Sequence, residues 1–141
     1  MKVMVLVKAS EATEAGRMPS EDELRAMGEY NEQLVAAAIM RGGDGLHASA
    51  RGRRVRFDGK GGHVVTSGPF SPAHEVLAGY WLWEVASMDE ATDWLKRAPS
   101  PAGAELELRQ VIAMEDFGEA ATPEIRERDQ RLRDATARQT G

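Results

Sequence analysis

The sequence predicts an α+β fold in which two helices pack on one face of an antiparallel sheet. Three observations predict it. The chain opens with a short apolar run at residues 2–8, and residues 104–113 alternate apolar and polar side chains. Between these two strands, Ser20 and Ser87 each mark a helix start that is followed by apolar side chains at helical spacing. The order of strand, helix, strands, helix and strand favours one layered α+β domain.

The first half of this pattern begins with a buried strand at residues 2–8. Its apolar run is too short for a signal sequence or a membrane span. Residues 9–18 are expected to form a polar loop. Ser20 and Glu23 then form a capping box, which predicts a helix over residues 21–41. The glycines that follow, Gly42 and Gly43, are expected to end this helix.

The middle of the chain predicts strands joined by turns. A short strand is expected at residues 46–49. Residues 55–57 and 63–66 read as the two arms of a hairpin, because glycine-rich residues 58–62 lie between them. Residues 79–86 are apolar on both faces and therefore predict a central strand, reached through a loop or short helical turn.

The C-terminal part predicts a domain boundary. A second helix begins at Ser87 and is stopped by Pro99 and Pro101, and the strand at residues 104–113 follows. After Phe117 the composition becomes highly charged, and proline after Thr122 predicts another helix start. The expected organisation is therefore a domain over residues 1–117 and a charged helical extension over 118–141.

This order indicates a ferredoxin-like sandwich with both helices on one sheet face. The other face then has no helix to cover it, and an uncovered apolar sheet face predicts an interface. The simplest cover is the same face of a second copy. We therefore expect a C2 homodimer whose two sheets meet face to face.

Composition excludes several classes of site. Cysteine is absent, so disulfides and thiolate chemistry are excluded. The three histidines lack the spacing of a metal-binding pair, and neither a metal nor a cofactor is expected. The net charge is −5, which disfavours nucleic acid, although residues 51–60 hold five basic side chains against one acidic one and could attract an anion. No stretch is apolar enough to cross a membrane, and a cytoplasmic protein is expected.

Several stretches, taken in order, resemble the YCII-related family, specifically the branch named for its D-G-P-F motif. The resemblance covers roughly residues 1–113. The matching stretches are Met1–Lys8, Tyr30-Asn31-Glu32-Gln33-Leu34, Gly45-Leu46-His47, Gly68-Pro69-Phe70, Glu75, Gly79-Tyr80-Trp81-Leu82, Ala91 and Trp94.

The resemblance implies a ferredoxin-like fold that dimerises sheet to sheet as a dimeric α+β barrel, with a cleft where the two sheets meet. For distant members it implies enzymes that use a histidine and an aspartate in the dimer cleft. This chain departs from the pattern at the motif, where Ser67 stands in place of the aspartate. Either that aspartate caps the turn, which serine also does, or this protein has lost a function.

The motif Ser67-Gly68-Pro69-Phe70 has a structural and a functional interpretation. As a corner, Ser67 would hydrogen-bond the turn backbone, Gly68 would take a positive φ, Pro69 would fix its own φ and Phe70 would pack. As a functional element, the same four residues would line the cleft. Ser67 lacks the surroundings of a nucleophilic serine.

His47 and His74 are the candidate catalytic residues. Each follows a predicted turn, and either imidazole could act as a general base near neutral pH. The alternative is that both are ordinary surface or core residues. His63, beside the glycine-rich turn, is expected to have no role.

Other candidate ligand-binding residues have charged or flat side chains. Arg54 and Arg56 lie two apart on a strand, so they share a face and could hold a carboxylate or phosphate. Trp81 and Trp83 could form flat walls, or simply belong to the core or dimer interface. Polar groups from the long helix could come from Tyr30 and Asn31.

Two functional classes remain open. The first, which we favour, is a ligand-binding or regulatory homodimer whose cleft holds a small organic or anionic ligand. The second is a cofactor-independent enzyme in which His47 or His74 moves a proton. The absent motif aspartate and the lack of paired carboxylates at catalytic spacing favour the first class.

Overall fold

A computed structural model describes residues 1–140. The chain divides into two compact units, one of Met1–Gln110 and a second that begins at Val111. The strands of the first unit are β1 (Lys2–Lys8), β2 (Met40–Gly45), β3 (Arg53–Phe57), β4 (His63–Ser67), β5 (Leu77–Glu84) and β6 (Leu106–Gln110). Its helices are α1 (Glu11–Glu14), α2 (Glu21–Ala36) and α3 (Met88–Leu95), with 3₁₀ turns η1 (Ser49–Arg51) and η2 (Ala73–Glu75).

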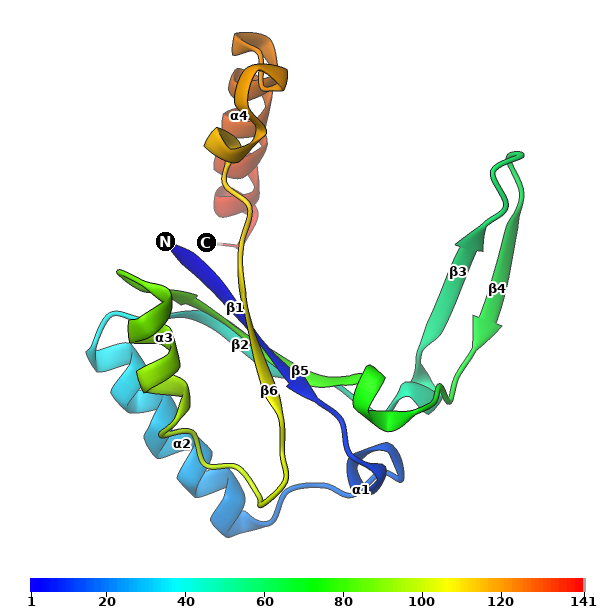
Figure 1. The fold of residues 1–141 in the computed structure, drawn as a ribbon, viewed down its shortest axis with the longest axis vertical. Helices are drawn as coiled ribbons and strands as arrows, with labels where there is room; N and C mark the ends of the chain where they lie inside the picture. Colours follow the sequence, from blue (N-terminus) through cyan, green and yellow to red (C-terminus); the bar gives the residue numbers. More distant parts are fainter. Residues whose placement is uncertain (141) are drawn as a thin grey trace. The chain divides into compact units, whose positions relative to one another are not determined.

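The main sheet has four strands in the order β2-β5-β1-β6, and every neighbouring pair is antiparallel. Helices α2 and α3 lie on the same face of this sheet (Figure 1). The prediction of an α+β fold is confirmed, and the topology is consistent with a ferredoxin-like fold. The hairpin β3–β4 follows β2 and precedes β5 along the chain, and it forms a separate two-stranded sheet.

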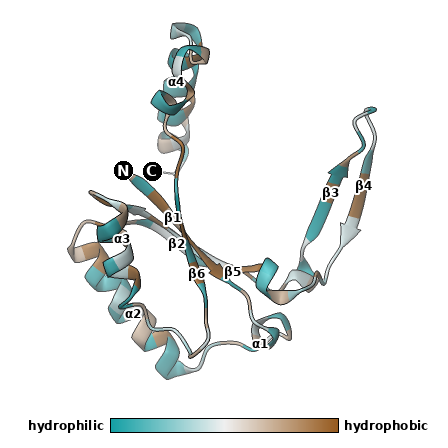
Figure 2. Cartoon of the chain, in the orientation of Figure 1, coloured by the Kyte–Doolittle hydropathy of each residue, from teal (hydrophilic) through white to brown (hydrophobic). Residues whose placement is uncertain are grey.

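The core lies between the sheet and the helices. Val3 pairs with Trp83 and Val5 with Trp81 on neighbouring strands β1 and β5, and all four side chains are buried against α2. Successive strand residues point to opposite faces, so one face of each strand supplies this core. Figure 2 shows the hydrophobic residues concentrated along β1 and β5.

The opposite sheet face carries a second apolar row. Met4 pairs with Leu82 and Leu6 with Tyr80, and each of these side chains is partly exposed. Their positions alternate with the core residues, so they point away from α2 and α3. Within the unit Met1–Gln110, no helix covers this row.

Two predicted segments are wrong around the end of the long helix. The helix α2 ends at Ala36, and the glycines expected to stop it belong to strand β2, which replaces the strand expected at residues 46–49. Gly43 explains this placement. A Cβ on Gly43 would lie 2.8 Å from Cδ1 of Trp81, so the glycine lets β2 approach the bulky face of β5.

The segment predicted as a polar loop at residues 9–18 contains the short helix α1. Ser10 caps it, since its hydroxyl accepts a hydrogen bond from the Thr13 amide at 3.2 Å. The Thr13 hydroxyl accepts from the Ser10 amide at 2.9 Å in return. This reciprocal pair is a capping box built from serine and threonine rather than from serine and glutamate.

The predicted hairpin is confirmed, and all ten residues of its two strands are exposed. One face carries Val55, Val65, Phe57 and His63, whose cross-strand pairing puts them together. The other face carries Arg54, Thr66, Arg56 and Val64. At the tip, the Asp58 carboxylate accepts hydrogen bonds from the amides of Lys60 and Gly62 at 2.7 and 3.0 Å.

The second unit consists of the 3₁₀ segment η3 (Met114–Ala120) and the helix α4 (Pro123–Thr140). The predicted helix start at proline is confirmed. Ion pairs one turn apart stabilise α4, among them Arg133 with Asp129 at 2.7 Å. Its two large apolar side chains, Ile125 and Leu132, are both exposed. The boundary at residue 117 and the role of this extension stay predictions. Across residues 1–140, no helix combines the length and apolar character that a membrane span requires.

Candidate functional site

Trp81 and Trp83, considered as cleft walls, and Tyr30, considered as a source of a polar group, lie in the core between α2 and the sheet. The exposed fraction is 4% for Tyr30, 6% for Trp81 and 0% for Trp83. Tyr30 packs edge-on against Trp81, with 5.9 Å between ring centroids. In this arrangement none of the three rings offers a face to a ligand.

The polar side-chain atoms of Tyr30 and Trp81 have hydrogen-bond partners, whereas that of Trp83 has none among the described residues. The Tyr30 hydroxyl donates to the Trp94 carbonyl at 2.7 Å, and burial raises the pKa of Tyr30 to about 12. The Trp81 indole donates to the Asn31 side-chain carbonyl at 2.9 Å, which ties α2 to β5. Only the Trp83 indole nitrogen is buried without a hydrogen-bond partner in residues 1–140.

The motif lies at the root of the hairpin, where β4 leads towards η2. Its Phe70 amide donates to the Ser49 hydroxyl at 2.8 Å, and its Gly68 amide donates to the Gly52 carbonyl at 3.0 Å. The Ser67 side chain forms no hydrogen bond within the described residues. The turn is therefore held by a serine eighteen positions earlier in the chain, not by Ser67 as the sequence suggested.

Gly68 is required for a reason different from the predicted one. Its φ is not positive. A Cβ at Gly68 would instead lie 1.7 Å from the Ser49 carbonyl oxygen and 2.6 Å from the carbonyl carbon. The glycine permits two backbone segments to touch, and any side chain there would force them apart.

The basic face of the hairpin meets the motif through a cation–π contact. The Arg54 guanidinium carbon lies 3.9 Å from the centroid of the Phe70 ring. Beside it, a partly open groove of about 390 Å³ is lined by Arg54, Val55, Arg56 and Thr66. The two arginines share the face that the sequence predicted. The guanidinium of arginine presents its N–H donors as a planar fork. When that fork is held against an aromatic ring, it is well suited to bind a planar anion.

His47 lies just before η1, exposed and in contact with Arg51. The distance from its Nε2 to Nη1 of Arg51 is 3.0 Å. Arginine only donates hydrogen bonds, so in this contact Nε2 of His47 is the acceptor. The nitrogen that a general base would use is therefore occupied by Arg51.

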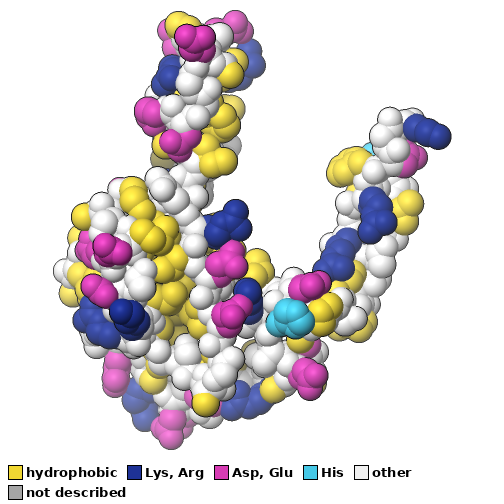
Figure 3. Space-filling view, in the orientation of Figure 1, with side chains coloured by type: hydrophobic (Ala, Val, Ile, Leu, Met, Phe, Trp, Pro, Cys, Tyr) yellow, Lys and Arg dark blue, Asp and Glu magenta, His cyan; other side chains and the backbone are white. Residues whose placement is uncertain are grey.

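His74 lies in η2, near a charged cluster at the end of β1 and the start of β6. There Lys8 forms ion pairs with Glu105 and, at 3.9 Å, with Glu107. The hydrogen bond from Lys8 lowers the pKa of Glu105, and a smaller electrostatic contribution from the nearby His74 acts in the same direction. The same hydrogen bond raises the pKa of Lys8. Figure 3 shows acidic, basic and histidine side chains gathered on this part of the surface.

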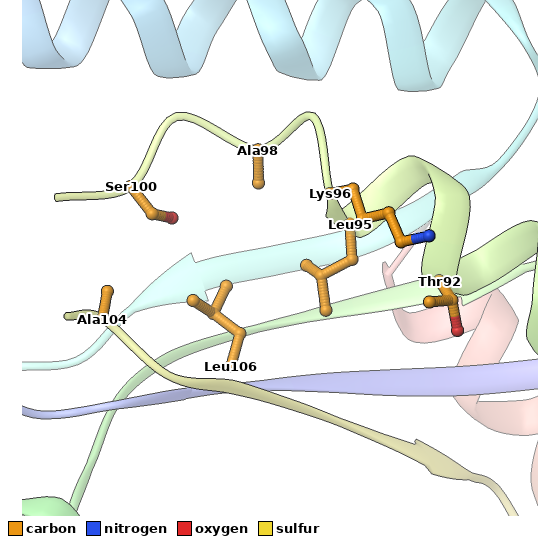
Figure 4. Close-up of a pocket in the computed structure, with 7 residues that line it drawn as sticks. All are labelled: Thr92, Leu95, Lys96, Ala98, Ser100, Ala104 and Leu106. Carbon is orange, nitrogen blue, oxygen red and sulfur yellow. The ribbon is translucent and has the colours of Figure 1, made fainter. Parts of the chain in front are cut away.

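A second groove, of about 370 Å³, lies between α3 and β6 (Figure 4). Leu95 and Leu106 face each other across it, and Thr92, Lys96 and Ser100 supply polar atoms. The one charged group among these, the Lys96 ammonium, lies 3.6 Å from the Asp93 carboxylate. This groove has apolar walls but no free cationic fork, so the hairpin root is the better anion site.

The described residues contain no group of three or more histidine, aspartate or glutamate side chains placed to hold a metal ion. Both histidine candidates, the motif and the arginines lie near the end of the sheet where β2 finishes and β5 begins. Tyr30, Asn31, Trp81 and Trp83 are not brought to this place.

The sequence did not predict the two residues that position Phe70, namely Ser49 and Glu14. Ser49 is 8% exposed, and its amide and hydroxyl both donate to the carboxylate of Glu14, the amide at 2.9 Å. Glu14 lies at the end of α1, in the segment expected to be a loop. No local spacing connects residues 14, 49 and 70, so sequence pattern alone offered nothing that points to this contact.

Comparison with known proteins gives one family match. The model of the YCII-related domain matches residues 1–115. No curated protein matches. Among solved structures, the chain is similar to 5-chloro-2-hydroxyhydroquinone dehydrochlorinase (TftG) from Burkholderia phenoliruptrix AC1100, determined in complex with 2,5-dihydroxybenzoquinone. That similarity has a TM-score of 0.41 and 16% sequence identity, and covers 82% of this chain and 98% of the other.

Proposed function

Since this chain belongs to the YCII-related family, we propose that it is a cytoplasmic homodimer of the D-G-P-F branch that binds a small organic anion. Residues 1–117 form the binding domain, and residues 118–141 are an extension of it. The ligand lies at the hairpin root, on the basic face that ends at Phe70.

One observation carries this proposal: the Arg54 guanidinium lies over the Phe70 ring at 3.9 Å, at the edge of a groove that Arg56 and Thr66 also line. The ring orients the fork of Arg54 and leaves its N–H groups available to a carboxylate or phosphate. The hydroxyl of Thr66 adds a neutral donor. The basic segment within an acidic protein favours an anionic ligand over a cationic one.

The ligand site is tested by titrating the protein with benzoate and with inorganic phosphate, followed by NMR or calorimetry. Replacing Arg54 with glutamine should weaken binding about tenfold, because a charge-assisted contact is lost. Arg53→Gln is the matched control. Arg53 has the same charge and lies on the same strand, but it pairs with Ser67 on the opposite face of the ribbon. Equal effects of the two substitutions would refute a specific site.

The homodimer is supported by an apolar row on the sheet face that no helix of the unit Met1–Gln110 covers, formed by Met4, Leu6, Tyr80 and Leu82. Covering it with the same face of a second copy would remove these side chains from water. Leu82→Asp should shift the mass measured by light scattering from dimer to monomer. Leu24→Asp, at an exposed position on the helix α2, should not. A wild-type chain that is monomeric at micromolar concentration would overturn the dimer.

The second candidate is a cofactor-independent enzyme with a histidine as general acid or base. It is favoured by the position of His74 beside the Lys8–Glu105 pair, whose charges would bias proton transfer. NMR titration of the three imidazoles tests it, with His63 as an exposed reference. A built acid–base site requires His47 or His74 to titrate differently from His63, and to lose that difference in Arg51→Gln or Lys8→Gln. Three coincident titrations would rule this candidate out.

A further inference from the structure

The position of Phe70 is set by a chain of hydrogen bonds that begins far away in the sequence. Glu14 accepts from the amide and the hydroxyl of Ser49, one bond to each carboxylate oxygen. The single proton of the Ser49 hydroxyl is therefore directed at Glu14. Its lone pairs face the other way, and one of them accepts the Phe70 amide at 2.8 Å.

Tightly packed backbone surrounds these hydrogen bonds between Glu14, Ser49 and Phe70. Ser49 is 8% exposed, its carbonyl accepts the Gly52 amide at 2.8 Å, and its carbonyl oxygen lies where a Cβ of Gly68 would be. A Cβ at Gly52 would lie 3.7 Å from Cε2 of Phe70. The backbone around Ser49 therefore leaves Phe70 little room to shift while its amide stays bonded.

Phe70 in turn determines where the fork of Arg54 points. The guanidinium lies over the ring, while within residues 1–140 Arg56 and Thr66, which also line the groove, form neither a hydrogen bond nor a cation–π contact with Phe70. A ligand that is only a point charge depends on the total positive charge of the two arginines. A flat anion such as an aromatic carboxylate also depends on the direction of the fork and on the ring beside it.

We propose that Glu14 and Ser49 are positioning residues that make the hairpin groove selective for planar organic anions over inorganic ones. They act through Phe70 and touch no ligand themselves. This inference rests on the proposed function and specifies the chemical class of its ligand: a carboxylate attached to a flat, conjugated or aromatic group.

The test compares the affinities of benzoate and inorganic phosphate in four variants of the full chain. In Ser49→Ala and Glu14→Ala, benzoate binding should weaken about fivefold or more, since the hydrogen bond that orients Phe70 is lost or loosened. Phosphate binding should change by less than about twofold, because both arginines remain. Glu11→Ala, on the same short helix, and Ser71→Ala, beside the motif, are the controls and should leave the ratio of affinities unchanged.

A separate measurement follows the hydrogen bond between the Phe70 amide and the Ser49 hydroxyl. The Phe70 amide should exchange with solvent faster in Ser49→Ala and Glu14→Ala than in wild type, and Ser49→Thr, which keeps the hydroxyl, should retain protection. If Ser49→Ala does not fold, Glu14→Ala carries the same comparison, because it removes the acceptor and leaves the serine in place.

The possible outcomes separate the two proposals. Equal loss of benzoate and phosphate binding, or no loss of either, overturns the selectivity role while the anion site stands. Wild-type protein that prefers neither anion, with binding that still depends on Arg54, also overturns it. Wild-type protein that binds neither anion removes the proposed function, and this inference with it.

Discussion

The sheet core and the hairpin root use their aromatic rings in opposite ways. In the core, Trp81 and Trp83 are buried among apolar side chains, and the polar partner of Trp81 is an amide on α2. At the root, Phe70 is partly exposed, carries a guanidinium on its face and is fixed through its backbone amide. The core buries its rings for stability, whereas the root holds one ring in place and leaves a charged group beside it open to water.

The comparison teaches that aromatic density along the sequence marks the core here rather than the site. Three aromatic residues in four positions, from Tyr80 to Trp83, form one strand of the sheet. The groups of the proposed anion site come instead from separate segments: two arginines spaced two apart on β3, the corner that ends at Phe70, and Ser49 earlier in the chain. Predictions that separate these two regions follow.

The largest effect is expected from Gly68→Ala. The added Cβ would collide with the Ser49 carbonyl, which is backbone and has no rotamer to move away. We expect a loss of about 3 kcal/mol in the free energy of unfolding, measured by urea denaturation. Gly28→Ala is the contrasting control, since no atom lies within 4 Å of its Cβ position on α2 and alanine favours a helix. A small effect at Gly68 would show that the root is looser than the core.

The next effect is a dependence on alkaline pH that comes from the core. The folded pKa of Tyr30, about 12, lies above its ordinary value of 10.0. The stabilising effect of burying the neutral phenol is therefore complete below pH 10 and is lost as the pH rises towards 12. The loss amounts to about 2–3 kcal/mol. In Tyr30→Phe, the decline of stability between these pH values should be reduced by that amount, as measured by chemical denaturation. An unchanged pH profile in this variant would contradict the assignment.

A smaller effect is expected for the hydrogen bond between α2 and β5. In a double-mutant cycle of Trp81→Phe and Asn31→Ala, the coupling energy should be about 1 kcal/mol, since each single change leaves the other polar group unpaired. Trp83 gives the internal contrast. Its indole has no partner, so Trp83→Phe combined with Asn31→Ala should be additive. Additivity in both cycles would show that the hydrogen bond between Trp81 and Asn31 does not stabilise the core.

The smallest effect is expected at the hairpin. Phe57 is 73% exposed, and Phe57→Ser should change the unfolding free energy by less than about 0.5 kcal/mol at low protein concentration. A larger loss that appears only as concentration rises would place the apolar face of the ribbon in a contact between copies. The measurement is thermal unfolding over a hundredfold range of protein concentration.

The fold was largely predictable from sequence, because its strands and helices follow local patterns. The capping serines, the alternation in β6 and the glycine-rich hairpin tip each act over a few residues. The prediction failed where tertiary contact overrides local preference. Gly42 and Gly43 resemble a helix stop, yet both lie in β2, where Gly43 comes so close to Trp81 that a Cβ would lie 2.8 Å from Cδ1 of the ring.

The candidate site was predictable only in part. The arginines share a face because of strand periodicity, and that spacing was readable. The positions of the tryptophans relative to the sheet faces depend on which face the helices cover, which alternation alone does not specify. Ser49 and Glu14 come together across 35 residues through a folded corner, and Ser49 takes the capping role that the sequence suggested for Ser67.

The bond between the Gly68 amide and the Gly52 carbonyl has a consequence for how this architecture can change. The chain leaves the body of the domain and returns to it at the same hydrogen-bonded pair, so residues 53–67 form a closed excursion. We expect that such a ribbon can be lengthened, shortened or exchanged without altering the register of β2 on β5. A set of chimaeras that share one four-stranded body and carry different ribbons would show whether the ribbon alone decides which ligand is bound.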